Sequence, residues 1–104
     1  MQIQINTNNH VEGHERMETY FREVITNSLK RFEDKVTRIE VHVGDENSHK
    51  SGDADKKCTI EARIAGMQPV AATNHANTLE KAIDGALDKI KKLLDTTFDK
   101  MKTH

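Results

Sequence analysis

Hydrophobic residues recur at helical spacing over Leu79–Lys102, near the C-terminal end of the sequence. The stretch contains no proline and one glycine, and its apolar residues return every three or four positions, which predicts one long amphipathic helix. Asn77 or Thr78 stands where a helix N-cap is expected. The apolar positions are Leu79, Ile83, Leu87, Ile90, Leu94, Phe98 and Met101, with Ala82, Ala86 and Leu93 beside them.

A second amphipathic helix is predicted earlier in the chain, over about residues 13–32. Glutamates crowd the start of this segment, and Lys30 and Arg31 lie near its end, an arrangement that the helix dipole favours. We therefore expect a helix with one face directed to the core. Its apolar positions are Met17, Tyr20, Phe21, Val24, Ile25, Leu29 and Phe32.

Four further segments show the alternation of apolar and polar residues that is typical of half-buried strands. They are residues 1–7, 37–44, 57–65 and 69–75. The third segment is the clearest, with Cys58, Ile60, Ala62 and Ile64 expected to face the core. Residues 45–56 contain no large apolar side chain and many turn formers, so a mobile loop is expected there.

The predicted order is β-α-β-β-β-α, and every element has a single apolar side. The simplest arrangement that buries all of these apolar sides is an α+β fold in which one four-stranded mixed sheet carries both helices packed on one face. A right-handed crossover makes the first two strands parallel, and the last three strands form an antiparallel meander. The other face of the sheet is expected to be polar and solvated. The 104 residues are interpreted as a single domain, residues 1–104.

Composition limits the classes of function. The net charge of −1 gives no general attraction to nucleic acid, so any polyanion site must come from local sorting of charge. The one cysteine excludes an internal disulfide and fits a reducing compartment. The sequence has neither an apolar run of membrane-spanning length nor a signal-peptide pattern at its start. A cytoplasmic protein without a membrane partner is expected.

The sequence contains few residues that could form a metal site or a catalytic site. His10 and His14 are four residues apart and would suit a metal if both lay on a helix, but Gly13 and the preceding asparagines place His10 before the helix. Two exposed histidines are the simpler interpretation. Cys58 faces inward on a strand, which favours a small apolar filler over a nucleophile. We predict no catalytic residue, metal, cofactor or small-molecule substrate, and hence a protein that is not an enzyme.

The charges of the last helix are sorted by flank. A row of lysines of this kind can lie along phosphates. The alternative is a solvated face held by local pairs such as Asp88–Lys92 and Lys91–Asp95. One flank carries Lys81, Lys89, Lys92 and Lys100, whereas the other carries mostly Glu80, Asp84, Asp88, Asp95 and Asp99, with Lys91 and Lys102 among the acids.

Several stretches together resemble the short ribosome hibernation factors, the family of the ribosome-associated inhibitor and the hibernation-promoting factor. They are the run AIDGALDKIKKLL, the tail DKMKTH, the opening MQIQI and the stretch KRFEDKVTRIEV. The resemblance covers nearly the whole chain, and AIDGALDK is its most specific piece. It implies an architecture like that of double-stranded-RNA-binding domains. Because the chain ends just after the second helix, it resembles the class without a C-terminal dimerisation domain.

The resemblance also implies a function. Members of this family bind the small ribosomal subunit near the decoding site, in the channel of messenger and transfer RNA, and inhibit translation in stationary or starved cells. The expected partner is therefore ribosomal RNA, with ribosomal proteins as further contacts. A divergent member that acts as a protein-interaction or regulatory module without strong RNA binding is the alternative. The expected RNA-binding residues are Lys81, Lys89, Lys92, Lys100 and Lys102, with Arg22, Lys30 and Arg31 on the first helix as further candidates.

Overall fold

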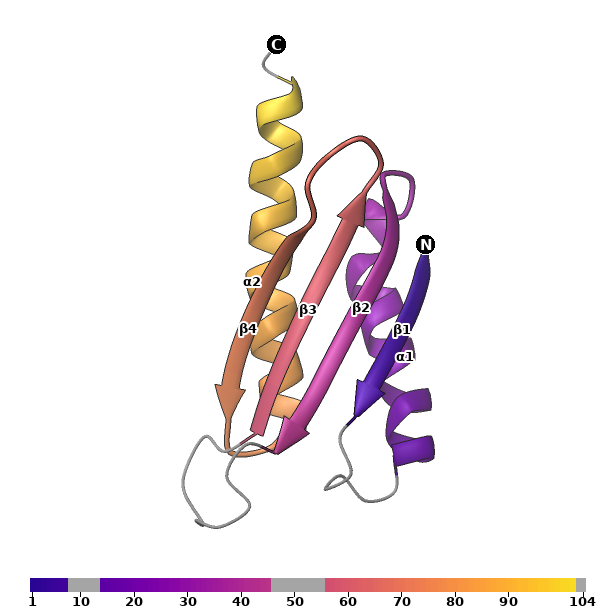
Figure 1. Ribbon diagram of the computed structural model, residues 1–104, viewed down its shortest axis with the longest axis vertical. Coiled ribbons are helices and arrows are strands. Elements are labelled where there is room, and N and C mark those ends of the chain that lie inside the picture. The colour runs from indigo at the N-terminus through magenta and orange to yellow at the C-terminus, as the bar shows by residue number, and fades with distance from the viewer. Residues whose placement is uncertain (8–13, 46–55, 103–104) are drawn as a thin grey trace.

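The computed structural model describes residues 1–7, 14–45 and 56–102. The elements follow the predicted order, and the long last helix has the predicted bounds (Figure 1). In chain order they are β1 (Gln2–Thr7), α1 (His14–Leu29), the short 3-10 helix η1 (Lys30–Phe32), β2 (Val36–Asp45), β3 (Lys56–Ile64), β4 (Val70–Ala76) and α2 (Leu79–Lys102).

Some sequence predictions fall outside the described residues. The greater part of the predicted mobile loop, residues 46–55, is one of them, and His10 is another. Nothing is described of the side chains of His14, Met101 and Lys102, although all three belong to helices. The predicted ends of that loop, Asp45 and Lys56, pair with each other as the ends of β2 and β3, so each strand extends one residue further into the predicted loop than expected.

The four strands form one mixed sheet in the order β1-β2-β3-β4. β1 lies parallel to β2, and the pairs β2–β3 and β3–β4 are antiparallel, as predicted. The register of β2 against β3 shifts between Val36 and Arg38. A bulge of this kind places one extra residue in a strand. Val36 and Ile39 are therefore both buried although they are an odd number of residues apart.

Both helices lie behind the same face of the sheet (Figure 1), as the single apolar side of each element predicted. The predicted inward positions of β3 are all buried. Along the middle of β3, Cys58, Ile60 and Ala62 have an exposed fraction of 0%. Among the described elements, this layered arrangement leaves the sheet edges β1 and β4 and the far side of each helix available for contacts with other molecules.

Tyr20 is a correction to the predicted core. Its exposed fraction is 53%, whereas the adjacent Phe21 is buried and their ring centroids lie 5.2 Å apart. Among the side chains of α1 that the structure describes, the buried ones are Phe21, Ile25 and Leu29, a narrow stripe spaced four residues apart. Helical spacing predicts the side of a helix that is apolar, but the width of the buried stripe depends on how much sheet lies beneath it. In the described part of the chain, no helix is long and apolar enough to cross a membrane.

Candidate nucleic-acid interface

The start of α2 sets the position of the lysine row. The side-chain oxygen of Thr78 accepts a hydrogen bond from the backbone N–H of Lys81 at 3.1 Å, so Thr78 and not Asn77 is the N-cap. Burial of the apolar stripe then fixes the rotation of the helix about its own axis. The buried residues of α2 are Ala82, Ile83, Ala86, Leu87, Ile90, Leu94 and Phe98.

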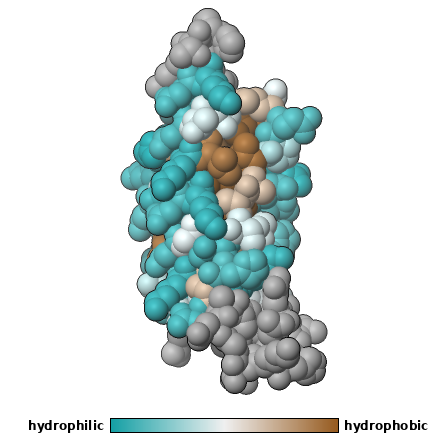
Figure 2. All heavy atoms as spheres, turned by 90° about the vertical axis from the view of Figure 1, so that its left-hand side faces the viewer, coloured by the Kyte–Doolittle hydropathy of each residue, from teal (hydrophilic) through white to brown (hydrophobic). Residues whose placement is uncertain are grey.

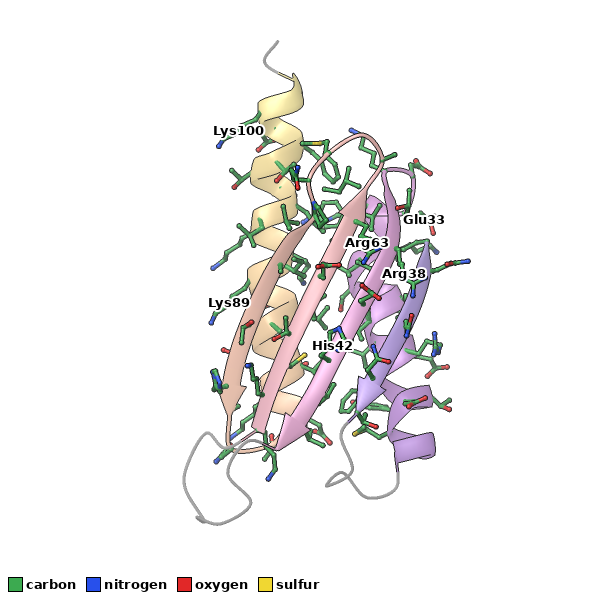
Figure 3. The ribbon with its side chains drawn as sticks, in the orientation of Figure 1. Glu33, Arg38, His42, Arg63, Lys89 and Lys100 are labelled. Carbon is green, nitrogen blue, oxygen red and sulfur yellow. The ribbon has the colours of Figure 1, made fainter. Side chains whose placement is uncertain are left out.

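The predicted lysine row lies on the exposed surface of α2. Lys81, Lys89, Lys92 and Lys100 are all exposed. Figure 3 shows Lys89 and Lys100 on the same side of the helix. With a rise of about 1.5 Å per residue, Lys81 and Lys100 are separated by about 28 Å along the axis. The row is therefore long enough to meet several phosphates.

Lys89 is held in place by the sheet. Its Nζ donates a hydrogen bond to the backbone carbonyl of Thr73 on β4, at 2.9 Å. An ammonium group has three N–H donors, so two remain for an external anion. The bond restrains a flexible side chain before any ligand arrives, which lowers the entropy lost on binding.

Lys92 is unrestrained. Among the described residues, its side chain forms no ion pair, so the predicted pair Asp88–Lys92 is wrong. Asp88 lies instead beside Lys91, with Nζ and Oδ1 4.0 Å apart. A helix brings residues three and four positions apart equally close, and here the nearer lysine is the one three positions on. Lys92 is left to act as a point charge toward solvent.

Arg31 forms an ion pair across the fold. Its guanidinium donates two hydrogen bonds to the carboxylate of Asp95 on α2, at 2.7 and 2.9 Å. These bonds lower the pKa of Asp95 and raise the pKa of Arg31. The predicted pair Lys91–Asp95 is thus replaced by a pair between different elements, although Lys91 lies close enough to lower the pKa of Asp95 further. The charge of Arg31 is neutralised, so the residue connects η1 to α2 and contributes little to an anion site.

The other predicted cations do not extend the row. Arg22 on α1 donates to the backbone carbonyl of Ile3 on β1, at the opposite sheet edge from Lys89. Lys30 is exposed on η1. Lys102 belongs to the last turn of α2, where it continues the helix that carries the row. The structure therefore groups four predicted residues and places Arg22, Lys30 and Arg31 elsewhere.

The open face of the sheet is polar, as predicted, but it is close to neutral. Arg63 donates to Glu61 and to Glu40, in each case at 3.1 Å, and Arg38 lies 3.5 Å from Glu40. The bond from Arg63 lowers the pKa of Glu61. Figure 3 shows Arg38, His42 and Arg63 on this face. Two arginines balanced by two glutamates make this face a weaker candidate for phosphate binding than α2.

Metal ligands and Cys58 were the other candidates for chemistry considered from the sequence. Within the described ranges, no group of three or more His, Cys, Asp or Glu side chains is placed to hold a metal ion. Cys58 is buried on β3, and burial raises the pKa of its thiol to about 12. A thiol with this pKa is protonated at neutral pH and is a poor nucleophile.

Comparisons with known proteins identify a matching family and two similar folds. Residues 3–102 match the protein family described as "Sigma 54 modulation protein / S30EA ribosomal protein". A search of curated proteins returned no match. The fold is similar to that of a ribosomal subunit interface protein from Coxiella burnetii, with 19% identity, a TM-score of 0.65 and full coverage of both chains. It is also similar to the Protein Y N-terminal domain of Thermus thermophilus, with 20% identity and a TM-score of 0.71, over 93% of this chain and 99% of that one.

Proposed function

The chain belongs to the Sigma 54 modulation protein / S30EA ribosomal protein family, and we propose that it is a ribosome hibernation factor that binds the small ribosomal subunit. This is a family of non-enzymatic, ribosome-associated factors that modulate translation. On this proposal the chain works in the cytoplasm as a single ribosome-binding domain. It occupies the channel of messenger and transfer RNA near the decoding site and inhibits translation under stress or in stationary phase.

The lysine row of α2 is the observation on which the proposal depends. Lys89 is restrained by the Thr73 carbonyl at 2.9 Å, and Lys92 is exposed beside it. Lysines act as point charges that contact phosphates and read no base edge. A row of this kind suits ribosomal RNA, whose folded helices are recognised largely by shape and backbone.

The acidic flank of α2 is partly neutralised, which supports the assignment of the anion site to the lysine row. On the acidic flank of α2, the carboxylate of Asp95 is compensated by Arg31 and that of Asp88 by Lys91. Each pair reduces the repulsion that an approaching phosphate would meet from that flank. Local sorting of charge therefore provides an anion site in a chain whose net charge is −1.

The test is a double charge reversal, Lys89→Glu with Lys92→Glu, followed by cosedimentation with purified small subunits at two salt concentrations. Each lost phosphate contact lowers the slope of log affinity against log salt by about 0.7 to 0.9. The variant should remain folded because both side chains are exposed. We expect much weaker binding and a shallower salt dependence.

A matched comparison is the double variant Arg22→Glu with Lys30→Glu, which changes the net charge by the same amount on a different surface. It should bind nearly as well as the parent chain. Equal loss in both double variants would mean that net charge and not the row is responsible. Undiminished binding of the Lys89/Lys92 variant would contradict the proposal and favour the alternative, a family member that acts as a protein-interaction module without strong RNA binding.

A further inference from the structure

A groove runs between the edge strand β4 and helix α2, beside the lysine row. Figure 2 faces this side of the molecule and shows a hydrophobic patch enclosed by hydrophilic surface. Leu93 is exposed by 39%, one of the few large apolar side chains at the surface of the described chain. Contacts with phosphates do not require an exposed apolar side chain, so Leu93 is available to a different kind of molecule. The residues that line the groove are Ala71, Ala72, Lys89, Lys92, Leu93 and Thr96.

One wall of the groove is an unpaired strand edge. Among the strands that the structure describes, β4 is the last of the sheet and pairs only with β3. The carbonyl of Thr73 points outward, because it accepts its hydrogen bond from Lys89 on α2. Backbone polar groups alternate in direction along a strand, so Ala71 presents its N–H and C=O to the same side. The edge thus offers the donors and acceptors that another strand requires.

We propose that this groove binds an extended acidic segment of a partner protein, which adds to β4 as a fifth strand. An added strand would lie about 4.8 Å from β4. Its inward side chains would lie over α2, where an apolar one would contact Leu93 and a carboxylate two residues along the strand, on the same face, would meet Lys92. This mode of recognition takes affinity from main-chain hydrogen bonds and specificity from side-chain positions.

Lys89 occupies the hydrogen-bonding position that the added strand would take. Without a partner its ammonium satisfies the outward carbonyl of Thr73. An incoming strand supplies a backbone N–H to that carbonyl, and the released ammonium pairs with a carboxylate of the segment. The exchange keeps the number of satisfied groups constant, so the edge is protected before binding and paired after it.

The lysines beside the groove favour one class of binding partner over the others. A second copy of this chain, paired β4 to β4, would bring Lys89 and Lys92 of one copy against the same lysines of the other, and the repulsion disfavours it. RNA contains no backbone with the alternating donors and acceptors of a strand, so it would leave the edge of β4 unused. An acidic polypeptide satisfies the strand edge, the apolar strip and the lysines together. This inference goes beyond the proposed function, since it concerns a protein partner.

The experiment uses a synthetic probe, an acetylated and amidated peptide in which every second residue is leucine and glutamate in turn, with threonine between them, so that both kinds of side chain share one face of the strand. It is titrated into the isotope-labelled chain. We expect the amide NMR signals of Ala71 and Thr73 and the methyl signals of Leu93 to shift and to saturate below about 1 mM peptide. A second peptide with the same charges but N-methylated at alternate residues cannot donate to the edge, and should bind at least about tenfold more weakly.

Leu93→Glu should weaken binding of the peptide at least about tenfold, because it replaces the apolar contact with a repelling charge. The control is Tyr20→Glu, which alters an exposed large side chain on the other helix and should leave peptide binding unchanged. Equal binding of the N-methylated peptide would show that only charge attracts the probe, and would overturn the inference. So would an absence of shifts at Ala71 and Thr73. Cosedimentation of the parent chain with small subunits is a separate measurement, so the two proposals can fail independently.

Discussion

The side-chain amide of Asn74 occupies the space that a side chain at position 85 would fill. A Cβ atom built on Gly85 would lie 2.1 Å from Nδ2 of Asn74. The same Nδ2 donates to the backbone carbonyls of Lys81 and Ala82, at 3.2 and 3.3 Å. Asn74 on β4 therefore joins the first half of α2 to the sheet edge, and Gly85 permits the close approach.

Gly85→Ala should destabilise the protein, although alanine favours a helix over glycine by about 1 kcal/mol. The new methyl group must displace Asn74 and break both of its hydrogen bonds, and overpacking of this kind costs roughly 1–3 kcal/mol. We expect a net loss of about 1 kcal/mol in the free energy of unfolding. Urea denaturation followed by circular dichroism measures it.

The decisive control is the same substitution in an Asn74→Ala background. There the obstructing amide is absent, so Gly85→Ala should stabilise the helix or have no effect. The two sites then show a coupling free energy of about 1 kcal/mol or more in a double-mutant cycle. Additive effects would mean that the contact between the two residues does not decide the preference for glycine.

Lys89 and Lys92 should differ in their effects on stability but not in their effects on RNA binding. Lys89→Met and Lys92→Met should each lower the salt slope of small-subunit binding by about 0.7 to 0.9. Only Lys89→Met should also reduce the free energy of unfolding, by about 1 kcal/mol, because its bond to the Thr73 carbonyl is lost. Lys92→Met should stay within about 0.5 kcal/mol of the parent chain. Identical unfolding curves for the two variants would contradict the restraint on Lys89.

The pair Arg31–Asp95 should make stability depend on acid pH. Because the folded-state pKa of Asp95 is lowered, its contribution is fully present above the ordinary carboxyl pKa and is lost as the pH falls through the folded-state value. Asp95→Asn should therefore lower the melting temperature slightly at pH 7 and leave it unchanged well below the folded-state pKa. Both groups are exposed, so the effect is small. Melting curves of parent and variant across this pH range test it, and a constant difference at all pH values would refute it.

Cys58 should be chemically inert while the protein is folded. Burial raises the pKa of its thiol to about 12, and its exposed fraction is 0%. Alkylation by iodoacetamide at pH 8, followed by mass spectrometry, should be far slower than for the unfolded chain in urea. The rate should follow global unfolding, because only the unfolded state exposes the thiolate. Rapid modification without urea would show a local opening between the helices and the sheet.

Local patterns of apolar and polar residues were sufficient to predict the architecture. The alternation of Cys58, Ile60, Ala62 and Ile64 predicted an inward face that is buried, and helical spacing predicted the bounds Leu79–Lys102. These features follow from the chain's own periodicity, which is the same in isolation and in the fold. The same periodicity placed Lys81, Lys89, Lys92 and Lys100 on one exposed flank.

Only the tertiary structure decided which of these charges are available. Arg31 and Asp95 are 64 residues apart in the sequence, and only the packing of η1 against α2 makes them an ion pair. The restraint of Lys89 by Thr73 likewise depends on where α2 crosses the sheet edge. Periodicity specifies directions within one element, whereas distances between elements depend on strand register, helix crossing and the widths of packed side chains. The sequence therefore determined the lysine row, and packing between elements determined which cations are restrained, neutralised or free.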